Sequence, residues 1–359
     1  MLFSARPMLA MTTAIVSALI ATTGFAAPAA PAFKPLPAIP AGDDLWDFAS
    51  WDSAHHRLIV AHGKDVLVID PATSAVRPIG KIGYAHAVVP LPGTDQILVT
   101  SKLDNSVRIL DGSSGSELVR IDVAADPDAT VLSADGHKAY IMAAKAGAIS
   151  VVDLDSKTET GRIALKTGLE VAVLATPTLL AVNSEDFDEI ELADLEHGKA
   201  AGTIPLPGCK GPTGLAMATG TGLSLSACDN GKAALVDIAK RKVVQMLPIG
   251  AGPDTVIWDA RHHRFLVPCG ESATLSIINL DSKGKAHVAA PVHTGPNART
   301  AALDPATGRI YLPSARLNPV VKGQPKTVAP GSFRVLALYP SRGTPPAPPA
   351  GLGAAGGGA

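Results

Sequence analysis

A repeat of about 42 residues runs through most of the chain and limits what it can fold into. Short apolar runs that each end in an acidic or amide residue recur at spacings of 41 to 43 residues. Their last residues are Asp70, Asp111, Asp153, Asp194, Asp237 and Asn279. Each unit holds four strand-like segments separated by turns, and no sustained 3.6-residue period interrupts them. A repeat of this length with four strands per unit predicts β-propeller blades.

Seven such units fit into the chain. In each unit, the second strand-like segment follows the opening residue by 9 to 11 positions, so the register is consistent throughout. The opening residues are Asp47, His86, Asp128, Glu170, Thr213, Asp254 and Arg299. We therefore expect an all-β, seven-bladed β-propeller with almost no helix.

The seventh unit lacks an outer strand. Its third strand-like segment, Phe333 to Tyr339, is followed by a stretch rich in Pro, Gly and Ala. The segment Phe33 to Gly42 resembles the end of a fourth strand such as Val244 to Gly252. Because the last blade would otherwise expose an unpaired edge, we expect this N-terminal segment to close the ring as its outer strand.

The N-terminus has the features of a signal peptide. Arg6 precedes the apolar stretch Met8 to Ala21, and Gly24 and Ala26 stand at the −3 and −1 positions of a cleavage site. The apolar stretch is too short to span a bilayer, so we expect no membrane insertion. The expected division is a signal peptide over 1–26, a propeller over 27–340 and a disordered tail over 341–359. The protein is then periplasmic or secreted.

Charge and motifs exclude several functions. The 31 basic and 32 acidic residues leave a net charge of −1, so no basic field is present to attract phosphate, and we expect no nucleic-acid partner. The sequence has no HExxH, GxSxG, phosphate-loop or CxxCH motif. It therefore carries no strong catalytic signature, and it leaves the identity of any cofactor open.

Several stretches resemble the YncE-like group of YVTN-repeat β-propellers. They are VLVIDPATSAV, SVRILDGSSG, the blade opening DPDAT, GPTGLAMA, SACDN and NARTAALDPATGRIYLPSA. The resemblance covers roughly residues 36 to 339. It implies a secreted seven-bladed propeller and supplies no reaction, so the function has to be argued from the site.

The blade-opening residues are the first candidates for such a site. The links between blades, and the loops between second and third strands, meet around the central channel on one face, which we call the top face. We expect a polar ring at the channel mouth, formed by Asp47, His86, Asp128, Glu170, Asp254 and Arg299. Such a ring can bind a polar ligand or a divalent cation, or perform acid–base chemistry. The alternative is structural, because polar groups in propeller channels also cap backbone amides and bond one another.

Two further candidates come from the loops between second and third strands. His62 and Asn230 belong to this layer, although ordinary solvated loop residues would explain them as well. In the seventh unit this loop is extended over residues 318–331, as either a lid over the mouth or a mobile insertion. At a solvent-filled mouth, we expect His86 and Arg299 to have few packing duties.

Other polar motifs are better explained by structure than by a site. The strand-end residues Asp70, Asp111, Asp153, Asp194 and Asp237 should cap their own turns on the opposite, bottom face. The pairs His55-His56 and His262-His263 occupy the same turn of two blades. A shared turn sequence explains these pairs better than metal binding, and we predict no metal site.

The three cysteines allow one disulfide. Cys209, in the link into the fifth unit, and Cys228, at the end of that unit's second strand, both approach the top face. Because an exported protein meets oxidising conditions, we expect these two to pair. Cys269 holds the position of Cys228 one blade later, so a Cys228–Cys269 pair across the gap between blades is the alternative.

Three functions are compatible with these features. The first is a monomeric binding or scaffold protein that holds a small polar ligand or a periplasmic partner protein at the mouth. The second is a lactonase-type hydrolase, in which a ring carboxylate and His86 position water and Arg299 polarises the carbonyl. The third is a structural protein without a ligand. We favour the first, and turnover of sugar and acyl lactones would separate it from the second.

Overall fold

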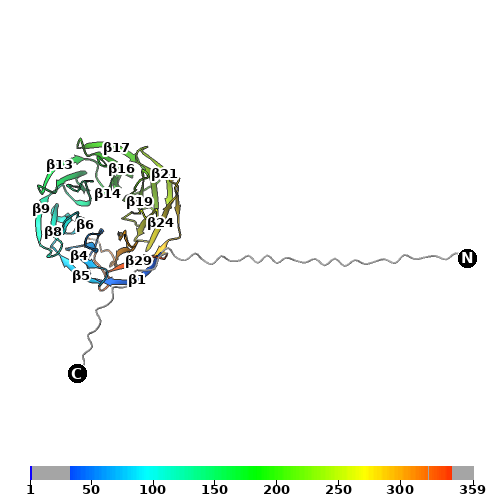
Figure 1. Cartoon of the computed structure of the whole chain (residues 1–359), viewed down its shortest axis with the longest axis horizontal. Coiled ribbons are helices and arrows are strands. Elements are labelled where there is room, and N and C mark those ends of the chain that lie inside the picture. The colour runs from blue at the N-terminus through cyan, green and yellow to red at the C-terminus, as the bar shows by residue number, and fades with distance from the viewer. Residues whose placement is uncertain (2–32, 322, 342–359) are drawn as a thin grey trace, which may run out of the picture. The chain divides into compact units, whose positions relative to one another are not determined.

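The computed structural model describes Met1, residues 33–321 and residues 323–341. The expected signal peptide apart from Met1, and the expected tail apart from Ser341, lie outside the described residues. In the described part, strands β1 to β29 form seven antiparallel sheets arranged in a ring (Figure 1). The expected all-β, seven-bladed β-propeller is confirmed.

The first four blades are regular four-stranded sheets. Blade 1 contains β2 (Ala49–Asp52), β3 (Arg57–His62), β4 (Asp65–Asp70) and β5 (Ala75–Ile79). Blade 2 contains β6 (Ala85–Leu91), β7 (Gln96–Ser101), β8 (Ser106–Asp111) and β9 (Glu117–Asp122). Blade 3 contains β10 (Pro127–Leu132), β11 (Lys138–Ala143), β12 (Ala148–Asp153) and β13 (Thr158–Ala164). Blade 4 contains β14 (Leu169–Thr176), β15 (Leu179–Ser184), β16 (Glu189–Asp194) and β17 (Lys199–Pro205).

The last three blades include two departures from this pattern, a fifth strand in blade 6 and a borrowed strand in blade 7. Blade 5 contains β18 (Pro212–Ala218), β19 (Leu223–Cys228), β20 (Lys232–Asp237) and β21 (Lys242–Pro248). Blade 6 contains β22 (Ile257–Asp259), β23 (Arg264–Cys269), β24 (Thr274–Leu280), β25 (Ala286–Val288) and β26 (Val292–His293). Blade 7 contains β27 (Ala302–Leu303), β28 (Ile310–Ser314), β29 (Arg334–Pro340) and β1 (Phe33–Pro40). Helix in the described residues is limited to the 3-10 turns η1 (Lys102–Asp104) and η2 (Glu185–Phe187).

The N-terminal strand closes the ring as expected. β1 runs antiparallel to β29, with Phe33 opposite Pro340 and Pro40 opposite Arg334. After β1, the carboxylate of Asp43 accepts hydrogen bonds from the backbone amides of Gly331, Ser332 and Phe333 at 2.5 to 3.1 Å. The first described strand therefore completes the last blade, and Asp43, three residues beyond it, caps the return of that blade's long loop.

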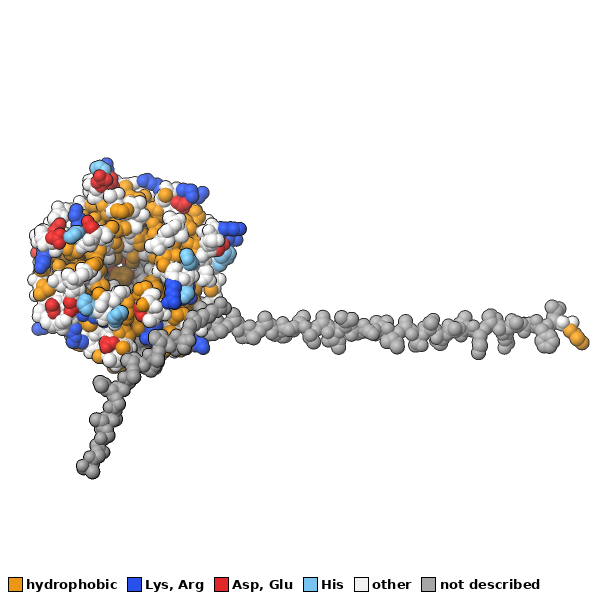
Figure 2. All heavy atoms as spheres, in the orientation of Figure 1, with side chains coloured by type: hydrophobic (Ala, Val, Ile, Leu, Met, Phe, Trp, Pro, Cys, Tyr) orange, Lys and Arg blue, Asp and Glu red, His pale blue; other side chains and the backbone are white. Residues whose placement is uncertain are grey.

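The core lies between the blades. Seven buried hydrophobic clusters each combine side chains of two neighbouring blades, and together they complete the circle. The second strands are almost wholly buried, while most fourth-strand residues are half-buried or exposed. Gly214 shows how tight this packing is, since a Cβ there would lie 2.7 Å from the backbone carbonyl carbon of Thr255 in the next blade. Figure 2 shows hydrophobic side chains around the hollow at the centre of the ring.

Three inner strands are shorter than the repeat predicts. β2, β22 and β27 begin two to three residues after the expected opening residues Asp47, Asp254 and Arg299. Before β2, side chains of blade 7 bond to the backbone carbonyls. Arg299 donates to the carbonyl of Trp46, and Thr300 donates to that of Asp47.

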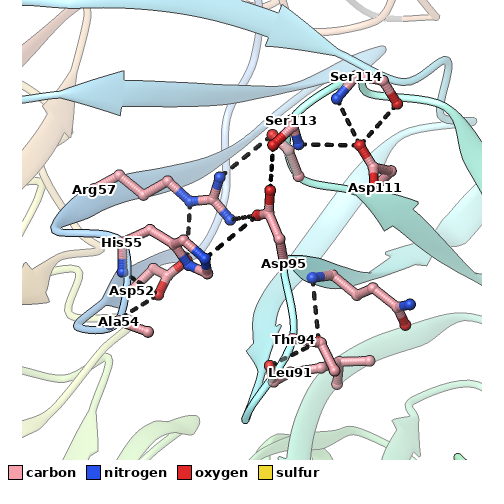
Figure 3. A network of polar contacts seen from close by, with 12 residues as sticks. Asp52, Ala54, His55, Arg57, Leu91, Thr94, Asp95, Asp111, Ser113 and Ser114 are labelled. Carbon is pink, nitrogen blue, oxygen red and sulfur yellow. Dashed lines mark hydrogen bonds and ion pairs between the residues drawn. The ribbon is translucent and has the colours of Figure 1, made fainter.

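A polar network on the bottom face joins blades 1 and 2 (Figure 3). Arg57 Nε donates to Asp52 Oδ2 at 2.9 Å, its Nη1 donates to the carbonyl of Gly112 at 3.3 Å, and its Nη2 pairs with Asp95. His55 Nδ1 lies 2.8 Å from Asp52 Oδ2. Blade 6 repeats the local part of this arrangement with Asp259, His262 and Arg264. The repetition agrees with a shared turn sequence as the origin of the two His pairs.

No helix among the described residues has the length and apolar character needed to cross a membrane.

Candidate functional site

A cavity of about 420 Å³ opens at the top-face end of the channel. We call it the mouth cavity, and its charged lining comes from blades 4 to 7 and from the extended loop of blade 7. These residues are Glu170, Glu185, Asp229, Asp254, Glu271, Arg299 and Lys326. Trp46 and Tyr84, from the links before blades 1 and 2, line it as well. Polar groups from well-separated parts of the chain therefore converge on one opening, as in many ligand sites.

Five of the six expected ring residues form a continuous arc of charges. His86 Nδ1 lies 3.1 Å from Asp47 Oδ2 and 3.2 Å from Asp128 Oδ2; both contacts are ion pairs by distance and neither has the geometry of a good hydrogen bond. Arg299 Nη2 lies 3.7 Å from Asp47 Oδ1, and its Nε donates to Asp254 Oδ2 at 2.7 Å. The order Asp128, His86, Asp47, Arg299, Asp254 runs through blades 3, 2, 1, 7 and 6. We call this set the polar arc.

The arc contradicts the expectation that His86 and Arg299 have few packing duties. His86 is only 6% exposed, and its Nε2 is buried without a hydrogen-bond partner among the described residues. Arg299 lies over the indole of Trp46, with its guanidinium carbon 5.7 Å from the ring centroid. His86 and Arg299 each lie between two carboxyls, where a positive charge offsets the negative charge of a buried carboxylate.

Burial controls the acidity of the arc. Burial raises the pKa of Asp47 to about 7, against the opposing effects of His86 and Arg299. The pKa of Asp254 is also raised by burial, although Arg299 opposes the change. For His86, burial lowers the pKa, but the contacts with Asp128 and Asp47 outweigh it and the net pKa is raised. At neutral pH the arc therefore holds its protons more tightly than free side chains would.

Glu170, the sixth ring residue, lies outside the arc on blade 4. Burial, followed by the charge of Asp128, raises its pKa well above the usual value. The pKa of the neighbouring Glu185 is raised by burial and by Asp186, while a hydrogen bond from Glu170 opposes this rise. Both carboxyls line the wall of the cavity. A second cavity of about 440 Å³, which also contains Lys102 and Lys145, shares both glutamates.

Two sequence candidates do not reach the mouth cavity. His62 is 4% exposed, with Nδ1 at 2.8 Å from Asp65 Oδ1 and Nε2 at 2.9 Å from the carbonyl of Gly42. Asn230 donates to the carbonyl of Gly208 and accepts from the amide of Lys210, so it fixes the link into blade 5. Both side chains use their polar atoms to hold connecting segments in place.

Glu185 and Asp229 are site residues that the sequence reasoning missed. Each directly follows the last residue of a second strand, Ser184 in β15 and Cys228 in β19. The ends of these strands were predicted from the sequence, so the first residue beyond each strand could have been chosen as a candidate. In blade 5 the residue chosen was Asn230, one position later. In the narrow opening, loss of water and the charge of Glu185 raise the pKa of Asp229 to about 6.

The extended loop of blade 7 reaches the mouth cavity. Leu317 and Lys326 line it, and the loop is folded back on itself by a bridge between Leu317 and Val328. The amide of Asn318 also donates to the carbonyl of Thr327 at 2.9 Å. The sequence left open whether this loop is a lid over the mouth or a mobile insertion. Its position at the cavity favours the lid.

The disulfide lies beside the site. Cys209 and Cys228 are bonded, and Cys269 is a buried free thiol, so the expected pairing is found and the alternative pairing is not. The bond ties the link before blade 5 to the end of β19, immediately before Asp229. In the described residues, no group of three or more His, Cys, Asp or Glu side chains has the arrangement of a metal site.

The bottom-face aspartates act on their own turns. Asp70 accepts hydrogen bonds from the amide of Ala72 and the hydroxyl of Thr73, each at 2.8 Å. Asp111 and Asp153 accept from Ser114 and Ser156 in the same way. Asp194 and Asp237 likewise accept from backbone amides within their own turns.

Comparisons with known proteins support the fold. No protein-family model matches the sequence, and no curated protein matches it. Among solved structures, a chain of Kuenenia stuttgartiensis hydrazine synthase is similar with a TM-score of 0.65 and 13% identity, over 77% of this chain and 94% of that one. A chain of a mitotic checkpoint complex is similar with a TM-score of 0.70 and 16% identity, over 92% of this chain and 99% of that one. At these identities the likeness shows the propeller fold alone, and no family match supports the YncE-like resemblance.

Proposed function

We propose that this chain is an exported binding propeller of the YncE-like type, whose ligand or partner protein is held at the mouth cavity. The observation that carries the proposal is the convergence of charged side chains from four blades and one extended loop on a single opening of about 420 Å³. A solvated channel end needs no such loop and no such concentration of charge. The expected signal peptide and the Cys209–Cys228 disulfide support export to an oxidising compartment.

The ring residues have separate roles in this proposal. Asp47, His86 and Asp128 form the buried floor, since they pair with one another and do not line the cavity. Three residues of the expected ring also line the cavity, namely Glu170, Asp254 and Arg299, so these are the ring residues that a ligand contacts. Glu185, Asp229 and Glu271 complete the contact set from the loops.

Thermal-shift screening of small polar compounds, followed by titration, tests the proposal. The exposed pair Asp229→Asn and Glu271→Gln should not lower the melting temperature, because the raised pKa of Asp229 means that its charge is disfavoured in the folded protein. The pair should weaken binding of a confirmed ligand about tenfold or more, since contacts to charged groups contribute about 1.5–3 kcal/mol. The bottom-face change Glu196→Gln should alter neither quantity. If both mouth variants bind every confirmed ligand as the parent protein does, the site is elsewhere.

The hydrolase hypothesis has less support. His86 is buried and does not line the cavity, so a water molecule held by His86 would lie beneath the cavity and away from a substrate bound in it. We therefore expect no turnover of sugar or acyl lactones. A measurable rate that disappears in Glu170→Gln would reverse this order of preference.

A further inference from the structure

The charges around the mouth cavity are unevenly compensated. Most basic side chains on the surrounding loops are paired with carboxylates other than those that line the opening. The pairs are Lys102 and Lys145 with Asp126, Lys166 with Glu189, and Lys210 with Asp188. Arg299 is held by Asp254 within the polar arc. Among the residues that line the cavity, Lys326 is the one basic side chain left.

Four lining carboxyls consequently lack a cationic partner. In the described part of the chain, Glu170, Glu185, Asp229 and Glu271 form no ion pair within 4.0 Å. The last three are exposed to solvent at the top of the opening. They are accessible to a cation that arrives from outside, and burial of that cation among them would be compensated by their charge.

Exposed apolar side chains occur on three of the loops that border this region. Leu103 follows Lys102 in η1 of blade 2 and is 78% exposed, and Phe187 ends η2 of blade 4 and is 49% exposed. Val320 and Val321, in the extended loop of blade 7, are 72% and 54% exposed. One such side chain alone needs no explanation. Here the segments that carry them also supply lining residues to the mouth cavity or to its neighbour.

We propose that the top face docks a partner polypeptide, which inserts a Lys or Arg side chain into the mouth cavity and rests its flanking apolar residues on Leu103, Phe187, Val320 and Val321. This inference rests on the proposed function and names the class of partner for the same opening. The charge selects a basic side chain. The apolar residues lie on loops outside the cavity, so a free amine that fills the cavity would leave them exposed, whereas a polypeptide reaches both.

A peptide array provides the test. The probes are nonapeptides with random flanks and Lys, Arg, Glu or norleucine at the centre, in equal numbers, probed with the mature protein; butylamine serves as the amine without a polypeptide. We expect Lys and Arg peptides with apolar neighbours to bind at least about tenfold more tightly than Glu or norleucine peptides, and to weaken with added salt. Equal binding of all four classes, or a preference for Glu, would overturn the proposal.

Variants separate the two halves of the contact. The double change Glu185→Gln and Glu271→Gln should abolish the preference for Lys and Arg, while Glu196→Gln on the bottom face should retain it. The double change Leu103→Ser and Phe187→Ser should weaken the best peptides severalfold without affecting butylamine. If butylamine binds as tightly as the best peptides, the occupant is a small amine and the polypeptide is rejected.

The outcome also distinguishes this inference from the proposed function. If no peptide binds but a neutral or anionic compound binds in a manner sensitive to Asp229→Asn, the mouth is a binding site and the inference about its partner is wrong. If neither peptides nor compounds respond to the mouth variants, both fail.

Discussion

At the scale of single residues, Arg299 forms ion pairs with two carboxyls, those of Asp47 and Asp254. If it is replaced by alanine, Asp254 and Asp47 are left in a buried site without their shared cation. Because Arg299 is about one-third exposed and Asp254 can take up a proton, we expect a loss of about 2–3 kcal/mol in the free energy of unfolding, at the low end for a broken buried pair. Chemical denaturation at pH 8 measures this loss. The control is Arg316→Ala, at an exposed arginine that forms no ion pair within the described residues, and it should change the free energy of unfolding by no more than about 0.5 kcal/mol. An unchanged stability of Arg299→Ala would show that the arc is not a structural unit.

The raised pKa values of the arc and of its neighbours predict a pH dependence. The pKa of Asp47 is about 7 in the folded protein against 3.8 as the ordinary value, and those of Glu170 and Asp254 are raised in the same direction. Between those limits the folded state binds more protons than the unfolded state, so the free energy of unfolding falls as pH rises from about 4 to about 7. His86, whose pKa is also raised, adds stability below its ordinary value of 6.5 that is lost as pH rises.

We therefore expect a higher melting temperature at pH 5 than at pH 8. When folding raises the pKa of one carboxyl by one unit, the free energy of unfolding is lower by about 1.4 kcal/mol at pH values above both the folded and the unfolded pKa. Turn aspartates such as Asp70 have lowered pKa values and act in the opposite direction, but below pH 3.8. Asp47→Asn should flatten the profile over pH 4–7, and a stability that rises over this range in the parent protein would contradict the assignment.

Arg57 and Arg264 occupy the same turn position in two blades but differ in what they join. Arg57 contacts Asp52 in its own blade and both Asp95 and Gly112 in the next blade. Arg264 pairs with Asp259 and lies over Phe33, while its Nη2 has no hydrogen-bond partner in the part of the chain that the structure describes. Arg57→Lys, which keeps the charge but loses the planar fork, should cost about 2 kcal/mol, and Arg264→Lys about half as much. Equal costs in urea titrations would mean that the link between blades 1 and 2 adds no stability.

Residue identity at the site could be predicted only in part from the sequence. The first residue of each unit is recognisable because it recurs at the same position of every repeat. From that position we predicted that the residues of the arc and Glu170 lie at the channel mouth. Asp229 lies in a loop whose course depends on tertiary contacts, including the disulfide at the residue before it. Periodicity does not encode such contacts, so Asn230 was as plausible a choice as its neighbour.

At the scale of elements, the disulfide stabilises the link that precedes blade 5. Cys209 and Cys228 close a loop with a sequence separation of 19 residues, which corresponds to about 3 kcal/mol in the chain-entropy model. The double change Cys209→Ala and Cys228→Ala should lower the free energy of unfolding by this amount. A reducing agent should have the same effect on the parent protein and no further effect on the double variant. A parent protein that is insensitive to reduction would show that the bond is not formed.

Strands were predictable where their pattern is local. All seven second strands contain the residue expected for them, because four- to six-residue apolar runs between turn signals are a short-range property. The inner strands of blades 1, 6 and 7 were expected to begin two to three residues earlier than they do, because the spacing of the repeat does not fix where the pairing of an inner strand starts. The fold of the extended loop also depends on distant residues, Asp43 among them.

At the scale of the whole molecule, closure determines whether the ring behaves as one unit. The blade-7 sheet is built from both ends of the described propeller, so the first and last repeats are joined within one sheet. β1 contributes Phe33 and Ile39, which are 1% and 3% exposed, to two different clusters between blades. Closure could be predicted from the sequence because the last unit lacks a fourth strand, whereas the N-terminal segment resembles a fourth strand and has no unit of its own.

Removal of the closing strand should therefore destabilise the entire ring. A chain that begins at residue 43 loses β1, exposes the edge of β29, and removes Phe33 from beneath Arg264 and Ile39 from the cluster between blades 7 and 1. Full burial of a large apolar side chain contributes about 1.5–3 kcal/mol, so these two residues alone account for about 3–6 kcal/mol, a large part of the stability of a typical domain. We expect a markedly lower melting temperature, and aggregation through the exposed edge. A chain that begins at residue 27 is the control, because it retains β1 and should melt like the full-length protein. Equal melting curves for the two shortened chains would show that the ring holds together without its closing strand.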